Sequence, residues 1–398
     1  MKNTSDASTN TNKKPKIAIV HDYLLQYGGA EKTLEAILEL FPNAPIYTGL
    51  YAPKNLPETI TKRKVYSLKN PLVRAFSKHF TFIMPMIFEN FDLTKYDIVI
   101  SDSSAWAKGV ITQPDQLHIS YIHTPPRFLY KYSVESPKRF KWYYKPIVAV
   151  LDHFLRIWDY CAGQRPDYLL TNSQTTAARI NKFYGREARV VHPPVEADLA
   201  KTTATEQEKN ATKPAKAMQA PYFCSLGRLA AYKNTHLLVQ AFNLLGWDLI
   251  VMGTGPEERK LKKLAQNNPK IKITGRVTEE QKNQILAGCK GLIFPVVEED
   301  WGIVPLEAMS HGKPVLAHKS GGATETVKAG VTGMFFESLE LEDFINSIKI
   351  FNQNIEEDLY KEEKIKQSVG NFSKETFKQE FLEFVKEKYR LHKEENQI

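Results

Sequence analysis

Short apolar runs separated by helical patterns recur along the chain from Ile17 onward. Most of these runs are continuously apolar rather than alternating, as expected for parallel strands that are covered on both faces. The alternation of strand and helix continues through both halves of the chain. It therefore predicts an α/β protein with two doubly wound, Rossmann-like domains that face each other across a cleft.

The first half begins with a strand that leads into a glycine pair. Gly28 and Gly29 follow this strand and directly precede a helical pattern at Ala30–Leu40. Glycines at that place let a phosphate approach the backbone closely and permit positive φ angles, although ordinary turns also use them. The strands expected here are Ile17–Val20, Ile98–Ser101, Leu117–Ile122, Tyr168–Thr171 and Val190–His192.

The second half repeats the pattern. Its expected strands are Tyr222–Leu226, Leu249–Met252, Ile271–Thr274, Leu292–Pro295 and Val315–Ala317, and its expected helices are Thr235–Leu245, Glu279–Ala287 and Pro305–Ser310. Gly253 and Gly255 resemble part of a dinucleotide fingerprint, but without a third glycine we interpret them as a strand-to-helix turn.

Composition shifts predict the domain limits. Residues 1–16 are polar and predict a disordered tail, and 201–220 lack aromatic residues and periodicity and predict a linker. Between them, 17–200 form the first domain, and 221–375 form the second. The remaining residues, 376–398, form a charged amphipathic helix.

Composition otherwise indicates a globular protein of the cytoplasm. The 398 residues contain three well-separated cysteines, which argues against structural zinc and for a reducing compartment. No apolar run reaches 18 residues, and the polar start is not a signal peptide.

The formal net charge of +9 is unevenly distributed. Two stretches, Thr61–Lys95 and Arg127–Pro146, combine many basic residues with aromatic ones, which fits the headgroup region of an anionic membrane. A solvated cationic face is the alternative. Nucleic acid is a weaker explanation, because no RRM, helix-turn-helix or OB pattern occurs.

The most informative segment is E-E-D-W-G-I-V-P-L-E-A-M-S-H-G-K-P, from Glu298 to Pro314. Pro305 suits the first turn of a helix and Gly312 its end, so Glu307 is expected in the first turn and Glu299 on the loop before it. Two carboxylates beside a helix N-terminus suit a ligand that carries both hydroxyls and phosphate.

This segment resembles the E-x7-E signature of retaining family-4 glycosyltransferases of GT-B architecture. Similar segments are V-H-D-Y-L-L-Q-Y-G-G-A-E-K, Y-I-H-T-P-P-R-F-L-Y, N-S-Q-T-T-A-A-R-I to V-H-P-P-V, and S-L-G-R-L-A-A-Y-K-N. Within the family, the likeness is greatest to bacterial mannosyltransferases that build cell-surface polysaccharides. The resemblance implies that the C-terminal helix crosses back to the first domain.

The resemblance implies a donor site in the second domain. Arg228 and Lys233 would neutralise the leaving nucleoside diphosphate. No D-x-D motif occurs, so we expect no metal cofactor. Glu299 would hold hydroxyls of the donor sugar and Glu307 the ribose diol. The other donor contacts implied are the backbone N–H groups of Gly302, Ile303 and Val304 at the phosphates, and Arg276 and Val277 at the base.

The first domain would supply the remaining contacts. His123 ends a predicted strand and, by the resemblance, contacts the sugar near its reacting centre; a core or capping histidine is the alternative. Asp22 is expected to face the acceptor. Trp301 receives no role beyond packing. Asn234 and His236 replace a basic and an acidic residue of related mannosyltransferases, which affects the identity of the donor.

The resemblance thus implies a hexosyltransferase that retains the anomeric configuration, with mannose from GDP-mannose as the favoured donor. The acceptor would be a glycan or a polyprenyl-diphosphate-linked oligosaccharide. A UDP-sugar enzyme of the same fold is the alternative, and a non-catalytic nucleotide- or nucleic-acid-binding protein is a remote one.

Overall fold

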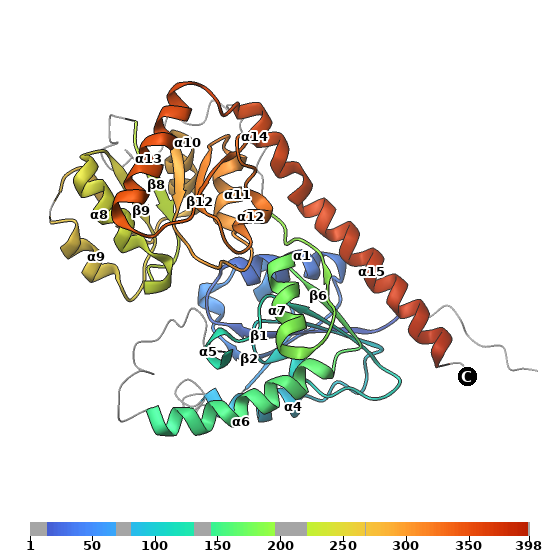
Figure 1. The fold of residues 1–398 in the computed structure, drawn as a ribbon. Helices are drawn as coiled ribbons and strands as arrows, with labels where there is room; N and C mark the ends of the chain where they lie inside the picture. Colours follow the sequence, from blue (N-terminus) through green and yellow to red (C-terminus); the bar gives the residue numbers. More distant parts are fainter. Residues whose placement is uncertain (1–13, 69–80, 131–144, 196–220, 267, 397–398) are drawn as a thin grey trace, which may run out of the picture. The chain divides into compact units, whose positions relative to one another are not determined.

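The computed structural model describes residues 14–68, 81–130, 145–195, 221–266 and 268–396. Within these ranges the chain forms two sheets, one of seven strands and one of six (Figure 1). Neighbouring strands are parallel throughout the six-stranded sheet and in most of the seven-stranded one, which confirms the prediction of doubly wound halves.

The seven-stranded sheet has the order β3-β2-β1-β4-β5-β6-β7. Its strands are β1 (Ile17–Leu24), β2 (Ile46–Tyr51), β3 (Val65–Ser67), β4 (Ile98–Ser103), β5 (Leu117–Ile122), β6 (Tyr168–Thr171) and β7 (Arg189–Val190). The helices of this part of the chain are α1 (Gly29–Leu40), α2 (Glu58–Thr61), α4 (Met84–Glu89), α5 (Arg127–Tyr130), α6 (Lys145–Gln164) and α7 (Gln174–Tyr184).

The six-stranded sheet has the order β10-β9-β8-β11-β12-β13. Its strands are β8 (Phe223–Leu226), β9 (Leu249–Met252), β10 (Ile271–Gly275), β11 (Gly291–Phe294), β12 (Val315–His318) and β13 (Gly333–Phe336). The helices are α8 (Thr235–Leu245), α9 (Glu258–Leu264), α10 (Glu279–Gly288), α11 (Ile303–Ser310), α12 (Ala323–Thr326), α13 (Leu341–Glu356), α14 (Glu362–Val369) and α15 (Lys374–Glu395). Short 3-10 turns lie at Pro53–Asn55, Thr81–Ile83, Ala107–Gly109, Ala231–Lys233 and Gly370–Phe372.

The chain divides into two compact units. Unit 1 comprises Met1–Ile122, Ile157–Leu170 and Leu382–Ile398. Unit 2 comprises His123–Arg156 and Thr171–Phe381. The last part of α15 thus belongs to unit 1, where His392 Nε2 lies 3.1 Å from the carbonyl oxygen of Asp115. The predicted tail lies mostly, and the predicted linker entirely, outside the described residues, and the predicted domain limits stay predictions.

Both sheets have a topological switch point at their centre. In the seven-stranded sheet, β1 lies between β2 and β4, so that the connections leave in opposite directions. In the six-stranded sheet, β8 lies in the same way between β9 and β11. Open α/β sheets bind ligands at such points, beyond the carboxyl ends of the strands.

Strands such as β9 and β11 form where the sequence supplies short, wholly apolar runs. All four residues of β9 and all four of β11 are buried, because helices cover this sheet on both faces. Helix α8 contributes Leu238, Ala241 and Phe242 to the same core. Among the described helices, none combines the length and the apolar character that a membrane span requires.

Candidate functional site

The switch point of the six-stranded sheet carries most of the predicted donor residues. The loop after β8 holds Arg228 and Lys233, and the loop after β11 holds Glu299. Arg228 and Lys233 line one small cavity, together with residues of β8, β9 and Val296. The fold therefore brings these cations together at the carboxyl ends of the central strands.

Two glycines allow the loop after β9 to support the loop that carries Arg228. A Cβ atom on Gly253 would lie 1.9 Å from the carbonyl oxygen of Gly227, and one on Gly255 would lie 2.3 Å from that of Leu229. Only glycine permits this close backbone contact. The interpretation of Gly253 and Gly255 as a strand-to-helix turn fits this role, because the turn buttresses a binding loop.

The acidic loop before α11 is held in an unusual backbone conformation. Glu298 has a φ of 54° and Gly302 one of 83°. The backbone N–H of Gly322 donates to the carbonyl oxygen of Glu299 at 2.7 Å. A Cβ on Gly321 would lie 2.3 Å from that same oxygen, so the loop is packed against backbone on one side. Strained, firmly held loops of this kind are common at functional sites.

Glu299 forms an ion pair with Lys233, and its side chain is 18% exposed. Burial alone would raise the pKa of Glu299, but the positive charges of Lys233, Arg127 and Arg179 outweigh it and lower the pKa. Glu299 is therefore an ionised, acceptor-only group near neutral pH, as hydroxyl binding requires.

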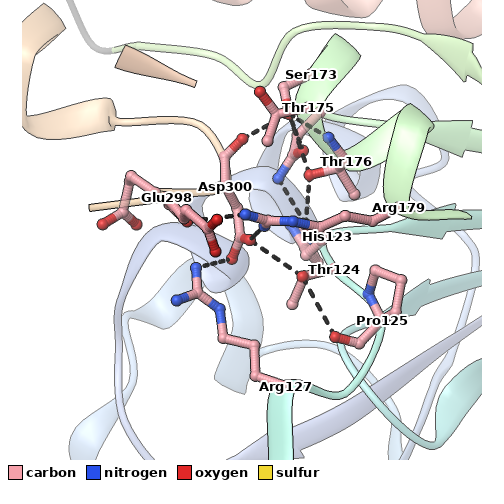
Figure 2. A network of polar contacts seen from close by, with 12 residues as sticks. His123, Thr124, Pro125, Arg127, Ser173, Thr175, Thr176, Arg179, Glu298 and Asp300 are labelled. Atoms are coloured by element: carbon pink, nitrogen blue, oxygen red, sulfur yellow. Dashed lines mark hydrogen bonds and ion pairs between the residues drawn. The ribbon is translucent and has the colours of Figure 1, made fainter. Parts of the chain in front are cut away.

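Asp300 forms the centre of a network that the sequence did not reveal (Figure 2). Its carboxylate accepts hydrogen bonds from Thr124 Oγ1 at 3.1 Å and from the guanidinium of Arg179, and pairs with Arg127 at 2.7 Å. Its carbonyl oxygen accepts a bond from Ser173. All these residues belong to unit 2. The network fixes the loop next to Glu299.

The charges around this loop do not balance. Lys233, Arg127 and Arg179 carry three positive charges against two on Glu299 and Asp300. Arg228, which is exposed and lines the small cavity with Lys233, adds a fourth positive charge. With the exposed carboxylate of Glu298 on the same loop, four positive charges face three negative ones, and this surplus suits an anionic group such as a diphosphate.

Glu307 lies in α11, but not where the sequence indicated. Helix α11 starts at Ile303, which makes Glu307 its fifth residue, so the expectation that it lies in the first turn is wrong. The reason is that Gly302, with its positive φ, caps the helix two residues earlier than a Pro305 start would place it. Pro305 remains within the first turn.

The carboxylate of Glu307 accepts a hydrogen bond from Lys282 Nζ at 2.8 Å, and Lys282 also pairs with Glu279 at 2.6 Å. Gly302, Ile303 and Val304 are the cap and first two residues of α11, whose N–H groups have no partner within the helix. Two residues follow the turn at Gly275: Arg276, which is exposed, and Val277, which is half-buried.

Two other predicted residues belong to unit 2. Trp301 is 5% exposed and stacks on His192 at 4.4 Å between ring centroids, which fits the packing role expected for it. The carbonyl oxygen of His123 accepts bonds from Asn172 Nδ2 at 2.8 Å and Thr176 Oγ1 at 3.4 Å. These bonds fix the backbone of His123 just after β5.

Unit 1 holds a second, buried polar cluster at its own switch point. His21 on β1 lies 2.8 Å from the carboxylate of Asp102 on β4 and 3.8 Å from Glu31. Burial alone would lower the pKa of His21, but the two acids raise it to about 10. Glu31 Oε2 also accepts the backbone N–H of Gly28 at 2.8 Å. The cluster thus holds the glycine pair.

The glycine pair itself does not use a positive φ. Gly28 has a φ of −149°, and Gly29 is not among the glycines with positive φ. That part of the expectation is wrong, because Gly28 caps α1 in an extended conformation. The available space fits the phosphate interpretation better, since a Cβ on Gly29 would meet nothing within 4 Å.

Asp22, expected to face the acceptor, is 7% exposed and is engaged by backbone. Its carboxylate accepts N–H bonds from four consecutive residues, at 2.6 to 2.9 Å: Ser104, Ala105, Trp106 and Ala107. It therefore caps the turn after β4. Contact with an acceptor stays a prediction.

Two further predictions concern metal and membrane. Over the part of the chain that the structure describes, no group of three or more His, Cys, Asp or Glu side chains could hold a metal ion. Residues 69–80 and 131–144 of the basic-aromatic stretches lie outside the described residues.

The second half of the chain matches a known protein family. Residues 206–368 match the family described as glycosyl transferases group 1. A GDP-mannose-dependent monoacylated alpha-(1-6)-phosphatidylinositol monomannoside mannosyltransferase of Corynebacterium glutamicum is 29% identical over 45% of this chain and 51% of its own length. An alpha-1,3/1,6-mannosyltransferase of Schizosaccharomyces pombe is 24% identical over 82% of this chain and 71% of its own length.

The fold has relatives among solved structures. The Anabaena HepE protein, solved in complex with UDP, superposes with a TM-score of 0.65 at 18% identity, over 93% of this chain and 100% of that one. This likeness establishes the fold as GT-B. The chain spans about half or less of the length of several curated relatives, with 26%, 41%, 51% and 48% covered in four of them.

Proposed function

We propose that this chain, which belongs to the glycosyl transferases group 1 family, is a retaining hexosyltransferase that moves mannose from GDP-mannose to a glycan or polyprenyl-diphosphate-linked acceptor. The product would enter cell-surface polysaccharide biosynthesis. The names of two relatives, both mannosyltransferases and one GDP-mannose-dependent, support the choice of sugar and base.

The observation that carries the proposal is the ion pair of Lys233 with Glu299 at the carboxyl ends of β8 and β11. An ammonium has three donors, so Lys233 can keep Glu299 and still donate to a phosphate oxygen. Arg228, on the same cavity, supplies a planar fork for the second phosphate. This pair of cations would stabilise the diphosphate as it leaves.

The carboxylates bind the hydroxyls on either side of the diphosphate. Glu299 accepts hydrogen bonds from the hexose, and its lowered pKa keeps it ionised for this purpose. Glu307, held by Lys282, accepts from the ribose diol. The first N–H groups of α11, at Ile303 and Val304, donate to the phosphates, with Gly302 forming the turn. Arg276 and Val277 contact the base.

The reaction retains configuration by attack on the face that the diphosphate leaves. The bond between the anomeric carbon and the phosphate oxygen breaks, and its electron pair stays on that oxygen. The acceptor hydroxyl oxygen then bonds to the anomeric carbon, and its proton passes to the departing phosphate oxygen. Fixed cations stabilise the negative charge that develops, without requiring a protein nucleophile.

In unit 1, the proposed ligand contacts are the glycine pair and the acceptor side near Asp22. The backbone at Gly29 is open enough for a phosphate or sugar to approach. The buried cluster around His21 holds Gly28 through Glu31. Asp22 shapes the acceptor side through the turn after β4. His123, which belongs to unit 2, contacts the hexose near its reacting carbon. The enzyme works in the cytoplasm, against the inner face of the cell membrane.

A panel of nucleotides tests the donor. A ligand that binds only the folded state stabilises it and so raises the melting temperature. At a free ligand concentration of a hundred times Kd, the unfolding free energy rises by about 2.7 kcal/mol. GDP and GDP-mannose should raise it more than UDP, ADP and their sugars. A larger shift with UDP would instead favour the UDP-sugar alternative, to which the UDP-bound Anabaena structure also points. No shift with any nucleotide would contradict the proposal.

A further inference from the structure

Helix α6 has an apolar stripe on its exposed side. Ile147 is 60% exposed, Val150 57%, Phe154 64% and Ile157 51%. Their spacing of three, four and three residues places them on one side of the helix. The stripe is continued by Tyr160, which is 49% exposed. Contiguous apolar surface of this kind usually marks an interaction site.

The acidic and the large apolar residues of α6 are distributed unlike those of an ordinary surface helix. Its only acidic residues, Asp152 and Asp159, are 8% and 0% exposed. Asp159 pairs with the buried ammonium of Lys108 at 2.6 Å. The helix thus directs both carboxylates inward together with Leu155, and leaves the four large apolar side chains of the stripe exposed. Packing among the residues that the structure describes does not explain that arrangement.

Helix α4, which neighbours the C-terminal part of α6, also has an exposed apolar side chain. Glu89, the last residue of α4, accepts a hydrogen bond from Trp158 Nε1 at 2.7 Å and pairs with Arg165 at 2.6 Å. These three residues belong to unit 1, where α4 and the C-terminal part of α6 lie side by side (Figure 1). Met86 on α4 is 64% exposed.

We propose that the α6 stripe (Ile147, Val150, Phe154 and Ile157) is the element through which this protein docks on an anionic bilayer. The side chains insert at the boundary of headgroups and acyl chains, with α6 lying along the surface rather than across it. The inference deepens the proposed membrane location, and only the use of a lipid-linked acceptor there rests on the proposed function.

Charge favours a lipid surface over a second copy of the chain. The three-four spacing would also suit a two-helix seam. Two copies, however, each carry a formal net charge of +9 and repel one another, whereas an anionic leaflet attracts that charge. The inward position of Asp152 and Asp159 also removes the acidic groups that anionic headgroups would repel.

Vesicle flotation of the full chain tests the inference. Vesicles of phosphatidylcholine alone and of phosphatidylcholine with phosphatidylglycerol are compared at low and high salt. The wild-type protein should float with the anionic vesicles, and less so at high salt. The double variant Ile147→Ser/Phe154→Ser should partition at least about tenfold less, because apolar area drives insertion.

A matched control tests whether flotation depends on the α6 stripe or on any exposed apolar side chain. Leu244 on α8 and Ile350 on α13 are 70% and 50% exposed, close to the stripe residues. The double variant Leu244→Ser/Ile350→Ser should float like the wild type. Equal flotation of the stripe variant and the wild type, or no flotation of the wild type with either vesicle, would overturn the inference.

Two further measurements keep the outcomes distinct. A wild-type dimer in sedimentation that Ile147→Ser/Phe154→Ser converts to a monomer would assign the stripe to self-association and contradict lipid docking. The thermal shift with GDP should be the same in the stripe variant and the wild type. If GDP shifts the melting temperature of neither protein, the proposed donor is contradicted. The flotation result still decides whether the stripe docks on a bilayer.

Discussion

The two switch points of this molecule use similar groups in opposite ways. In unit 1, His21, Asp102 and Glu31 are buried and bonded to one another and to backbone. In unit 2, Lys233 and Glu299 are 15% and 18% exposed, among cations that outnumber the acids. The same position in the fold thus serves once as a support for a loop and once as a place for a ligand.

The difference shows that a polar cluster at the end of a parallel sheet is not sufficient evidence of a binding site. In unit 1 the two acids neutralise the charge of His21, and all three side chains are buried, so no positive charge is available to a ligand. In unit 2 the excess positive charge needs a partner, which a diphosphate would supply. Variants that disturb each cluster should therefore change different properties, stability in unit 1 and turnover in unit 2.

The largest effect is expected for His21→Ala. Removing one member of a buried charged pair leaves Asp102 without its partner, which costs about 3–5 kcal/mol of unfolding free energy. Urea denaturation monitored by circular dichroism measures it. A loss below about 1 kcal/mol would contradict the view that this cluster is a structural support.

The pH dependence of the same pair has a definite sign. The folded pKa of His21, about 10, lies above its ordinary value of 6.5. Its contribution is therefore complete below pH 6.5 and is lost as the pH rises towards 10. Wild-type unfolding free energy should fall between these values more steeply than that of His21→Ala. Parallel curves for the two proteins would be the contrary result.

Arg228→Ala and Lys233→Ala should each reduce turnover about a hundredfold, close to 3 kcal/mol of transition-state stabilisation. Arg228→Ala should unfold at nearly the wild-type denaturant concentration, because its side chain is exposed. Lys233→Ala should stay folded but unfold at a lower denaturant concentration, because it also breaks the largely buried ion pair with Glu299. Lys260→Ala is a suitable control, since Lys260 is an exposed cation on α9. Near-normal turnover in both site variants would defeat the diphosphate assignment.

Glu307→Gln should weaken GDP binding about tenfold, since a hydrogen bond to a charged group contributes about 1.5 kcal/mol or more. Lys282 keeps Glu279 as a partner in this variant, so the fold should be preserved. Calorimetric titration with GDP measures the change. An unaltered affinity would remove Glu307 from the nucleotide site.

The smallest effect on stability is expected for Gly29→Ala. A Cβ there meets nothing within 4 Å and the φ is not positive, so the unfolding free energy should change by less than about 1 kcal/mol. Turnover should nevertheless fall, because the methyl group occupies the space proposed for the ligand. Normal turnover would indicate that the glycine pair serves only to begin α1.

Local sequence patterns predicted much of this fold. The strands β5, β6 and β9 and the helix α8 match their expected limits, because short, largely apolar runs and a regular helical pattern leave few alternatives. The internal strand β2 was missed, although five of its six residues are buried. The edge strands β3 and β13 were not predicted either. Neither is wholly buried, and their pairing depends on neighbours far along the chain.

The candidate site was predictable only where residues share one motif. Glu299 and Lys233 followed from a family resemblance, and the structure brings them together. The bonds of Asp300 with Thr124, Arg127 and Arg179 connect residues 121 to 176 positions apart, a distance over which sequence periodicity carries no information. The exposed face of α6 was also missed, because composition does not tell which side of a helix is buried.

A crystal structure with GDP-mannose bound tests the central claim most directly. The account predicts the diphosphate within hydrogen-bonding distance of Arg228 and Lys233, with the hexose hydroxyls on Glu299 and the ribose on Glu307. A donor bound elsewhere, with both glutamates directed into solvent, would contradict it.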